Sequence, residues 1–373
     1  MMFQKVFKLV PITMGSLVST TTLLTAADFE TRVSAIEAQV DAISQKSVHD
    51  NWGAKYPSTR PKEFRHGLII SGDLLYWRAD EDGLEYAIKS KNGSVGQNWI
   101  NATLEDLHFD WNWGYRAGIG YDLPWDGWDF YLNYTHYKND ASGSKSHGPQ
   151  SFLGAIWIPG GSVLANNAKA RWHLKYNTLD LEIGRNYFLS RALSFRPFFG
   201  VRGAWIDQNM RYSYDLPTYV PPFFYKTRFK NDYHAFGLLA GMNINWFFNN
   251  HWSIYGKAAA SGLHGEFDVT THVRQTAADP AYSGGLVLIN AKDEIHRVRY
   301  SLEAALGLQW ETYFSKNRHR FSISLGYEFL QWFHQNQLKK FLTNQNPGIL
   351  GAYTQQHGNL GLQGGTLAAR FDF

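Results

Sequence analysis

Apolar and polar residues alternate along much of the chain with a period of two. The clearest segment runs from Leu107 to Tyr121, where every second residue is apolar or aromatic and the others are polar or glycine. The segment from His296 to Phe314 repeats the pattern with charged residues on its polar face. Strand side chains point alternately to two faces, whereas a helical period of about 3.6 would scatter both sets. We therefore predict an all-β fold.

The predicted strands are unusually long. Strands of globular proteins commonly have about five or six residues, and these alternate for far longer. Long strands with one apolar and one polar face are typical of a transmembrane antiparallel β-barrel, in which the apolar row meets lipid and the polar row meets the lumen. We predict ten strands, and a hairpin within 84–100 would raise the number to twelve. The ten are 67–79, 105–121, 127–139, 168–188, 192–212, 231–247, 252–269, 293–314, 319–336 and 357–373.

Short and long connections alternate between these strands. The short ones are flanked by aromatic residues, as expected of periplasmic turns beside an aromatic girdle, and the long ones are typical of extracellular loops. The apolar face changes parity near Asn177, and we expect a β-bulge at that residue. There the apolar set moves from Trp172, Leu174 and Tyr176 to Leu179, Leu181 and Ile183.

Both ends of the chain suggest export. Lys5 and Lys8 precede an apolar run that ends in Ala26, so we predict a signal peptide over 1–26. The last strand ends in Phe371 and Phe373, which resemble the C-terminal signal read by the outer-membrane assembly machinery. We expect the bacterial outer membrane as location and its lipid as surroundings.

Residues 28–47 follow a different rhythm, because apolar residues there are spaced four and three apart as in a heptad. This segment predicts a short periplasmic helix, which either forms a homotrimer or is an amphipathic helix that stays single. Residues 48–66 read as a linker, and 67–373 form the predicted barrel domain.

Composition excludes several functions. Without Lys5 and Lys8 the 36 basic residues become 34 against 32 acidic residues, a net charge near +2, which argues against nucleic acid. There is no cysteine for a disulfide scaffold, and the 14 histidines show no metal-binding spacing, so we predict no metal and no cofactor. His108 and Asp110 resemble half of the Asp/His arrangement of omptin-type proteases, but no second acidic pair matches them. We therefore predict that the protein is not an enzyme.

The charged residues on the polar faces are the candidate functional residues. Their signs nearly cancel, which allows two interpretations: they pair across a closed lumen, or they line a water-filled path whose selectivity follows the local sign. In the second case Arg196, Arg202, Arg297 and Arg299 would form an anion-attracting cluster. The predicted lumen residues are Asp73, Asp110, Arg116, Asp180, Glu182, Arg196, Arg202, Lys257, Arg297, Arg299, Glu303, Glu311, Glu328, Arg370 and Asp372.

Several stretches resemble a known family. GDLLYWRA at 72–79 with GLEY at 83–86, WGYRAGIGY at 113–121 and LSFRPFFGVRGAWID at 193–207 are similar to the MOMP-like pore-forming outer-membrane proteins, the Legionella-type major outer membrane proteins also found in chlamydia-related bacteria. The resemblance implies an abundant surface porin or adhesin-like protein. We accordingly predict a porin that passes small hydrophilic solutes or ions. The alternative is a closed barrel that acts through its long loops as an adhesin or structural envelope protein.

Overall fold

A computed structural model describes residues 33, 34, 36, 37, 67–90, 101–124, 127–148, 151–159, 163–190, 192–216, 222–277, 285–314, 319–342 and 352–373. Within these ranges, no helix has the length and hydropathy required to cross a membrane. Val33, Ser34, Ile36 and Glu37 are helical and exposed. The rest of the predicted helix, the signal peptide and the linker lie outside the described residues, so trimerisation through 28–47 stays a prediction.

Ten antiparallel strands close into a ring, which confirms the predicted barrel and its strand number. The ring closes at β1, which pairs with β5 on one side and with β18, the last strand, on the other. Side-chain alternation carries this fold, because each strand presents one face to the lumen and the other to the surroundings. In ring order the strands are β1 (Gly67–Glu81), β5 (Trp111–Asp122), β6 (Trp128–Ser146), β9 (Asn167–Arg185), β11 (Leu193–Leu216), β12 (Phe223–Phe247), β13 (Trp252–Ala277), β14 (Leu286–Phe314), β15 (His319–Trp332) and β18 (Leu360–Asp372).

Short strands accompany the ring. The hairpin suspected within 84–100 exists only in part and does not join the wall, because β2 and β3 belong to a separate four-stranded sheet. β16 and β17 form a two-stranded hairpin, and β4 and β10 extend the wall. These strands are β2 (Ala87–Ser90), β3 (Ala102–Glu105), β4 (His108–Phe109), β7 (Phe152–Ala155), β8 (Val163–Leu164), β10 (Tyr187–Phe188), β16 (Lys339–Leu342) and β17 (Ala352–Gln355).

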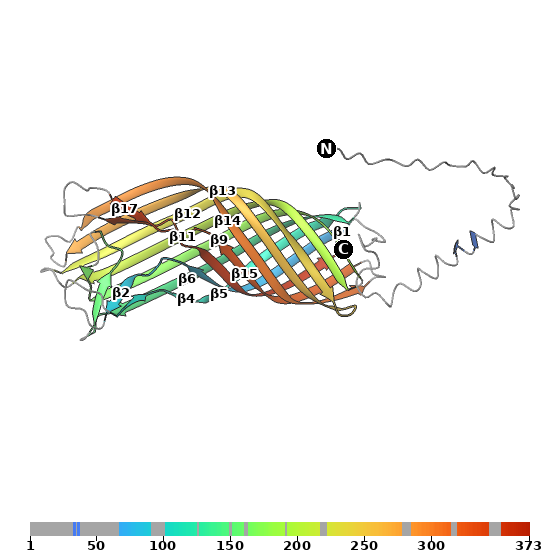
Figure 1. Cartoon of the computed structure of the whole chain (residues 1–373), viewed down its shortest axis with the longest axis horizontal. Coiled ribbons are helices and arrows are strands. Elements are labelled where there is room, and N and C mark those ends of the chain that lie inside the picture. The colour runs from blue at the N-terminus through green and yellow to red at the C-terminus, as the bar shows by residue number, and fades with distance from the viewer. Residues whose placement is uncertain are drawn as a thin grey trace, which may run out of the picture. The chain divides into compact units, whose positions relative to one another are not determined.

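The two ends of the barrel differ. The end that carries the C-terminus holds the short connections, and we call it the turn end; β2 and β17 lie at the opposite end, the loop end (Figure 1). Short turns of bacterial outer-membrane barrels lie in the periplasm, so we assign the loop end to the cell exterior. The wall is uneven at the loop end. β15 stops opposite Ser301, whereas β14 continues to Leu286.

The wall reverses its polarity partway along. Near the turn end of β9, Leu179 and Leu181 point outward and are exposed, and Asp180 is buried in the lumen. Near the loop end the outward residues are polar, such as Lys175, and Trp172 is buried inside. A membrane explains the first arrangement and water the second. The barrel therefore has a polar interior within the membrane and an apolar interior above it.

The strand registers correct two predictions. β9 keeps an unbroken register with β6 and β11 past Asn177, so the expected bulge is absent there; the apolar set changes face because the surroundings change from water to lipid. Conversely, 105–121 is not one strand. Gly114 pairs with Tyr137 but Phe109 pairs with Ala141, a one-residue slip between β4 and β5. A register irregularity also lies between Val273 and Arg274.

The lipid-facing band has the thickness of a membrane. On β14 the outward apolar residues run from Val298 to Trp310, twelve residue steps. At about 3.3 Å per residue and a tilt of about 40°, this spans about 30 Å, which matches a hydrocarbon core.

An arginine in this band should destabilise the barrel. We expect Leu181→Arg to lower the free energy of unfolding by about 2–4 kcal/mol, because Leu181 faces lipid. Guanidinium titration of the protein refolded in lipid vesicles measures the effect. The control is Thr270→Arg, on the outward face of β13 beyond the band, which should change little. Equal losses at both positions would contradict the assigned band.

Candidate functional site: the filled lumen

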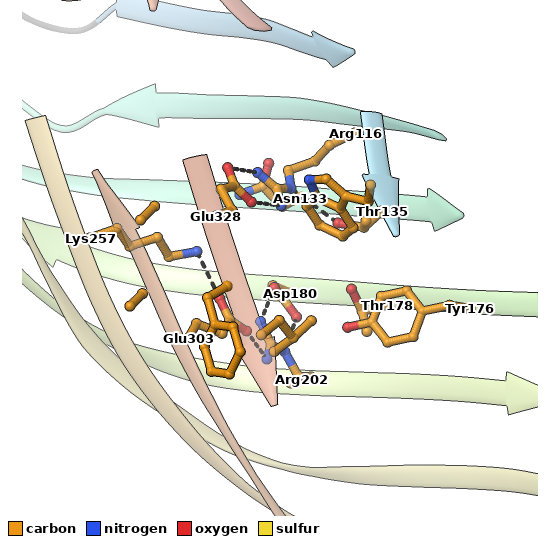
Figure 2. A pocket seen from close by; sticks show the side chains of 15 residues that line it. Arg116, Asn133, Thr135, Tyr176, Thr178, Asp180, Arg202, Lys257, Glu303 and Glu328 are labelled. Carbon is orange, nitrogen blue, oxygen red and sulfur yellow. Dashed lines mark hydrogen bonds and ion pairs between the residues drawn. The ribbon is translucent and has the colours of Figure 1, made fainter. Parts of the chain in front are cut away.

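Seven charged side chains cross the lumen at membrane level, and we call them the charged layer. They come from seven different strands and include four carboxylates and three cations, a net charge of −1. Figure 2 shows six of them around a small shared pocket; the seventh, Asp73, binds Arg116. The members are Asp73 of β1, Arg116 of β5, Asp180 of β9, Arg202 of β11, Lys257 of β13, Glu303 of β14 and Glu328 of β15.

Arg202 is the most deeply buried member, with a side chain 3% exposed. Its Nε and Nη2 donate to the two oxygens of Asp180 on the neighbouring strand, both at 2.6 Å. Its Nη1 reaches across the lumen to Glu303, which also binds Lys257 Nζ at 3.1 Å. The planar guanidinium fits a carboxylate with two parallel hydrogen bonds. Arg202 therefore joins β9, β11 and β14 through paired charges.

Arg116 plays the same part on the other side of the layer. It donates to both oxygens of Glu328, at 3.1 and 2.8 Å, and to Asp73 at 3.1 Å. Its Nε donates to Thr135 at 3.2 Å. The space left between the two arginine clusters is about 20 Å³. That volume holds about one water molecule.

Aromatic rings form a second layer on the loop-end side. Tyr176 of β9 and Trp332 of β15 contact each other with ring centroids 6.4 Å apart. These strands lie five places apart in the ring of ten, so this contact spans the full width of the lumen. Trp332 also contacts Tyr233 of β12, which stacks on Phe267 at 4.2 Å. All four side chains are buried, which closes the lumen with packed rings.

A chain segment crosses the lumen beyond the rings. Residues Gln335, Asn336 and Gln337 follow β15 and are almost fully buried. Asn231 of β12 donates to the carbonyl of Gln335 at 2.9 Å, and Asn336 donates to the carbonyl of Asp82 next to β1 at 2.9 Å. Since β12 and β1 lie on opposite sides of the ring, this segment bridges the barrel.

Nearby, burial raises the pKa of the Glu81 carboxyl, which accepts a hydrogen bond from Gln208.

The turn end carries further ion pairs. Arg196 binds Asp129 through two hydrogen bonds, at 2.9 and 2.5 Å, and Glu182 at 3.2 Å. Closer to the mouth, Asp372 binds both Arg320 at 2.6 Å and Arg370 at 2.7 Å. Arg370 is the most exposed of these side chains, at 36%. The lumen thus becomes wetter toward the periplasm.

Most predicted lumen residues lie on inward faces of the strands. Their ion pairs determine whether their charges remain available to attract ions. Arg196 and Arg202 each bind two carboxylates, so they do not join Arg297 and Arg299 in an anion-attracting cluster. Arg299 is buried over the ring of Phe267, at 5.1 Å. The inward-facing set contains Asp73, Arg116, Asp180, Glu182, Arg196, Arg202, Lys257, Arg297, Arg299, Glu303, Glu311, Glu328, Arg370 and Asp372.

Asp110 is the exception. It is exposed and lies at the register slip between β4 and β5, where its carbonyl accepts a hydrogen bond from Asn139. His108 is exposed too and pairs with exposed Ser142. Both residues were predicted to face the lumen because the alternation was extended from β5. The register slip between β4 and β5 shifts that alternation by one residue.

Sequence reasoning missed two lumen residues. Asp129 and Arg320 are the main partners of Arg196 and Asp372, and both lie at the first residues of their strands. Both lie within the predicted strands 127–139 and 319–336 but were not included among the predicted lumen residues. The alternation of β6, with Phe130 and Leu132 outward, places Asp129 on the inward face and could have revealed it.

Three carboxylates converge on the outer wall, Glu266, Asp268 and Glu294. Lys292 binds two of them, Glu294 at 2.6 Å and Asp268 at 3.3 Å. These two carboxylates raise the pKa of the Lys292 amine. Lys292 therefore offsets part of the negative charge of this group.

Comparison with known proteins bears on the family. The profile of a family described as Legionella pneumophila major outer membrane protein precursor matches residues 59–373. No curated protein matches the chain. Among solved structures, the outer membrane protease OmpT from Escherichia coli is similar over 86% of this chain and 99% of its own, with 12% identity and a TM-score of 0.38.

A FadL homologue from Pseudomonas aeruginosa is similar over 87% of this chain and 98% of its own, with 8% identity and a TM-score of 0.23. The toluene transporter TodX from Pseudomonas putida covers 85% and 92%, with 8% identity and a TM-score of 0.24. Likeness at this level does not bear on function. The profile match, in contrast, covers the whole barrel, and the chain therefore belongs to the Legionella pneumophila major outer membrane protein family and is an outer-membrane β-barrel protein.

Proposed function

We propose that this protein is a closed barrel that acts in the outer membrane as an adhesin or structural envelope protein. The barrel anchors an extracellular part that we call the head: the four-stranded sheet of β2, β3, β7 and β8 and the loop-end parts of the wall strands. The contact of Tyr176 with Trp332 carries the proposal, because it spans the lumen between opposite strands. The charged layer lies beneath this contact and the crossing segment above it. Three successive layers therefore separate the periplasm from the exterior.

The small number of strands supports closure. About eight strands give an interior that side chains alone can fill, whereas porins with an aqueous channel have about 16–18. Ten strands lie near the first case. Arginine and glutamate are long enough to meet across such a lumen, as Arg202 and Glu303 do from strands three places apart in the ring.

The head has its own core. Trp157, which follows β7, stacks on Tyr212 of β11 at 5.2 Å and donates from its indole to the carbonyl of Glu85 at 2.7 Å. Tyr214 donates to the carbonyl of Tyr86 at 2.7 Å. The four-stranded sheet thus packs against β11 at the loop end of the wall. It would support the loops there.

The proposed role is not enzymatic. His108 and Asp110, the pair considered as half of a protease site, do not meet in the lumen: His108 lies on the exposed face of β4 and Asp110 at the register slip.

Passage of small hydrophilic solutes or ions is a second candidate. Its support is the polar lining at the turn end, where the side chains of Arg320 and Arg370 are 26% and 36% exposed. Such a pore would require the aromatic rings and the crossing segment to move together. In the conformation described here they block the path.

Planar-bilayer recording separates the two candidates. We expect the refolded protein to insert without discrete conductance steps, and heat-modifiable gel migration checks that it has folded. Reproducible steps would overturn the closed barrel. In that event Lys257→Glu should shift the reversal potential toward cations, because it reverses a charge in the charged layer, whereas Lys89→Glu in the head sheet should leave it unchanged.

A further inference from the structure

Three arginines lie side by side on the outer wall near the loop end. Arg211 of β11 is directly opposite Arg171 of β9 on one side and Arg228 of β12 on the other. All three side chains are exposed. Side chains directly opposite each other on neighbouring strands have Cβ atoms about 4.5–5.5 Å apart, and like charges in such pairs destabilise a sheet. The three arginines therefore do not stabilise the sheet, and we looked for a ligand that their positive charge could bind.

Further cations surround the row. Lys169 and Lys226 lie two residues toward the loop end, and Lys230 lies two residues toward the membrane, all exposed on the same face. We call these residues the basic wall patch; its members are Lys169, Arg171, Arg211, Lys226, Arg228 and Lys230.

Carboxylates lie only at the edges of the basic wall patch. On the membrane side, Asp207 is 3.8 Å from Lys175 and Asp232 is 4.0 Å from Lys230. On the loop-end side, Asp215 binds Asn167. Among the described residues, no ion pair joins Arg171, Arg211 or Arg228 to a carboxylate. Beyond β12, the same outer face turns acidic at Glu266, Asp268 and Glu294.

The position of the patch indicates its partner. Its residues continue the outward face that meets lipid: on β11 the last outward apolar residue is Trp205, and Arg211 follows six residue steps later. At about 3.3 Å per residue and a tilt of about 40°, Arg211 lies about 15 Å beyond the hydrocarbon. Ordinary headgroups add only about 5–8 Å to each side of the hydrocarbon, so Arg211 lies at the level of a longer, sugar-based headgroup.

We propose that the basic wall patch binds the phosphate groups of outer-leaflet glycolipid, the lipopolysaccharide headgroup. Arginine forks bind phosphate with two hydrogen bonds, and a row of three matches a headgroup that carries several anions. A bound headgroup would cancel the repulsion within the row. The proposal does not depend on whether the lumen conducts.

Binding of lipopolysaccharide to the refolded full chain in detergent, followed by calorimetry, tests the proposal. The test variant replaces Arg171, Arg211 and Arg228 by serine. The control replaces Lys89, Lys145 and Lys292 by serine, which removes the same charge outside the patch. Each surface cation contributes about fivefold to binding of anionic lipid, so we expect the test variant to bind at least about tenfold more weakly than wild type and the control to match wild type. Heat-modifiable migration checks the fold of both variants.

Two further probes identify the source of the anion. Chemically dephosphorylated lipopolysaccharide should bind as weakly to wild type as the intact molecule does to the test variant. Heparin, a soluble sulfated polysaccharide, should bind wild type more weakly than lipopolysaccharide. Equal binding of phosphorylated and dephosphorylated forms, stronger binding of heparin, or equal losses in the test and control variants would each overturn the proposal.

Discussion

Replacing Arg202 by alanine is expected to destabilise the barrel by about 3–5 kcal/mol. Arg202 is 3% exposed and separates Asp180 from Glu303. Without its guanidinium, two buried carboxylates face each other with Lys257 as the nearest cation. Chemical unfolding of the refolded protein in lipid vesicles measures the loss.

Two variants control for this result. Arg202→Met combined with Asp180→Asn removes this buried pair and leaves Glu303 bound to Lys257. It should lose less stability than Arg202→Ala alone, because no unpaired charge remains buried. Arg370→Ala breaks an ion pair that is 36% exposed, and it should cost less than about 1 kcal/mol. If Arg202→Ala were as mild as Arg370→Ala, the charged layer would not be a buried network.

Replacing Trp172 by alanine should cost about 3–5 kcal/mol, although Trp172 lies beyond the membrane band. Its side chain is 2% exposed, contacts Phe109 at 5.4 Å and donates from its indole to Gln208 at 3.0 Å. Truncation would leave a cavity in the apolar core of the head and an unpaired amide. The same unfolding experiment measures this loss.

His173→Ala is the matched control, because His173 is the neighbour on the opposite face of β9 and is exposed. It should change stability by less than about 0.5 kcal/mol. The two values test the reversal of the wall directly. A barrel with lipid-facing Trp172 would give the opposite result, a small loss for Trp172→Ala.

Local alternation was enough to predict much of the fold. Period-two patterns placed all ten wall strands, and the outward rows of β14 and β18 were assigned correctly, because a strand within the membrane has one face in lipid and one in the lumen. The same logic placed fourteen of the fifteen candidate residues on inward faces. The prediction for Asp110 was wrong because β4 and β5 both alternate, and the sequence does not show the one-residue register slip between them.

Three features required the tertiary structure. The parity change near Asn177 reads as a bulge in the sequence, and only the unbroken pairing of β9 shows that the surroundings change instead. The extracellular ends of some strands, such as Ser213 to Leu216, were not predicted as strand, because their outward residues are polar. Closure depends on Tyr176 meeting Trp332, which are 156 positions apart in the chain.

The sequence by itself determined the class of this protein and the polar lining of its lumen within the membrane, since these follow from which side chains alternate within one strand; it left ten or twelve strands open. The tertiary structure decided which charges neutralise each other, whether the lumen is filled, and that three arginines stand in one row. The physical reason is that pairing depends on register and on strand order around the ring. Both relate residues that are distant in the chain, and neither leaves a local pattern.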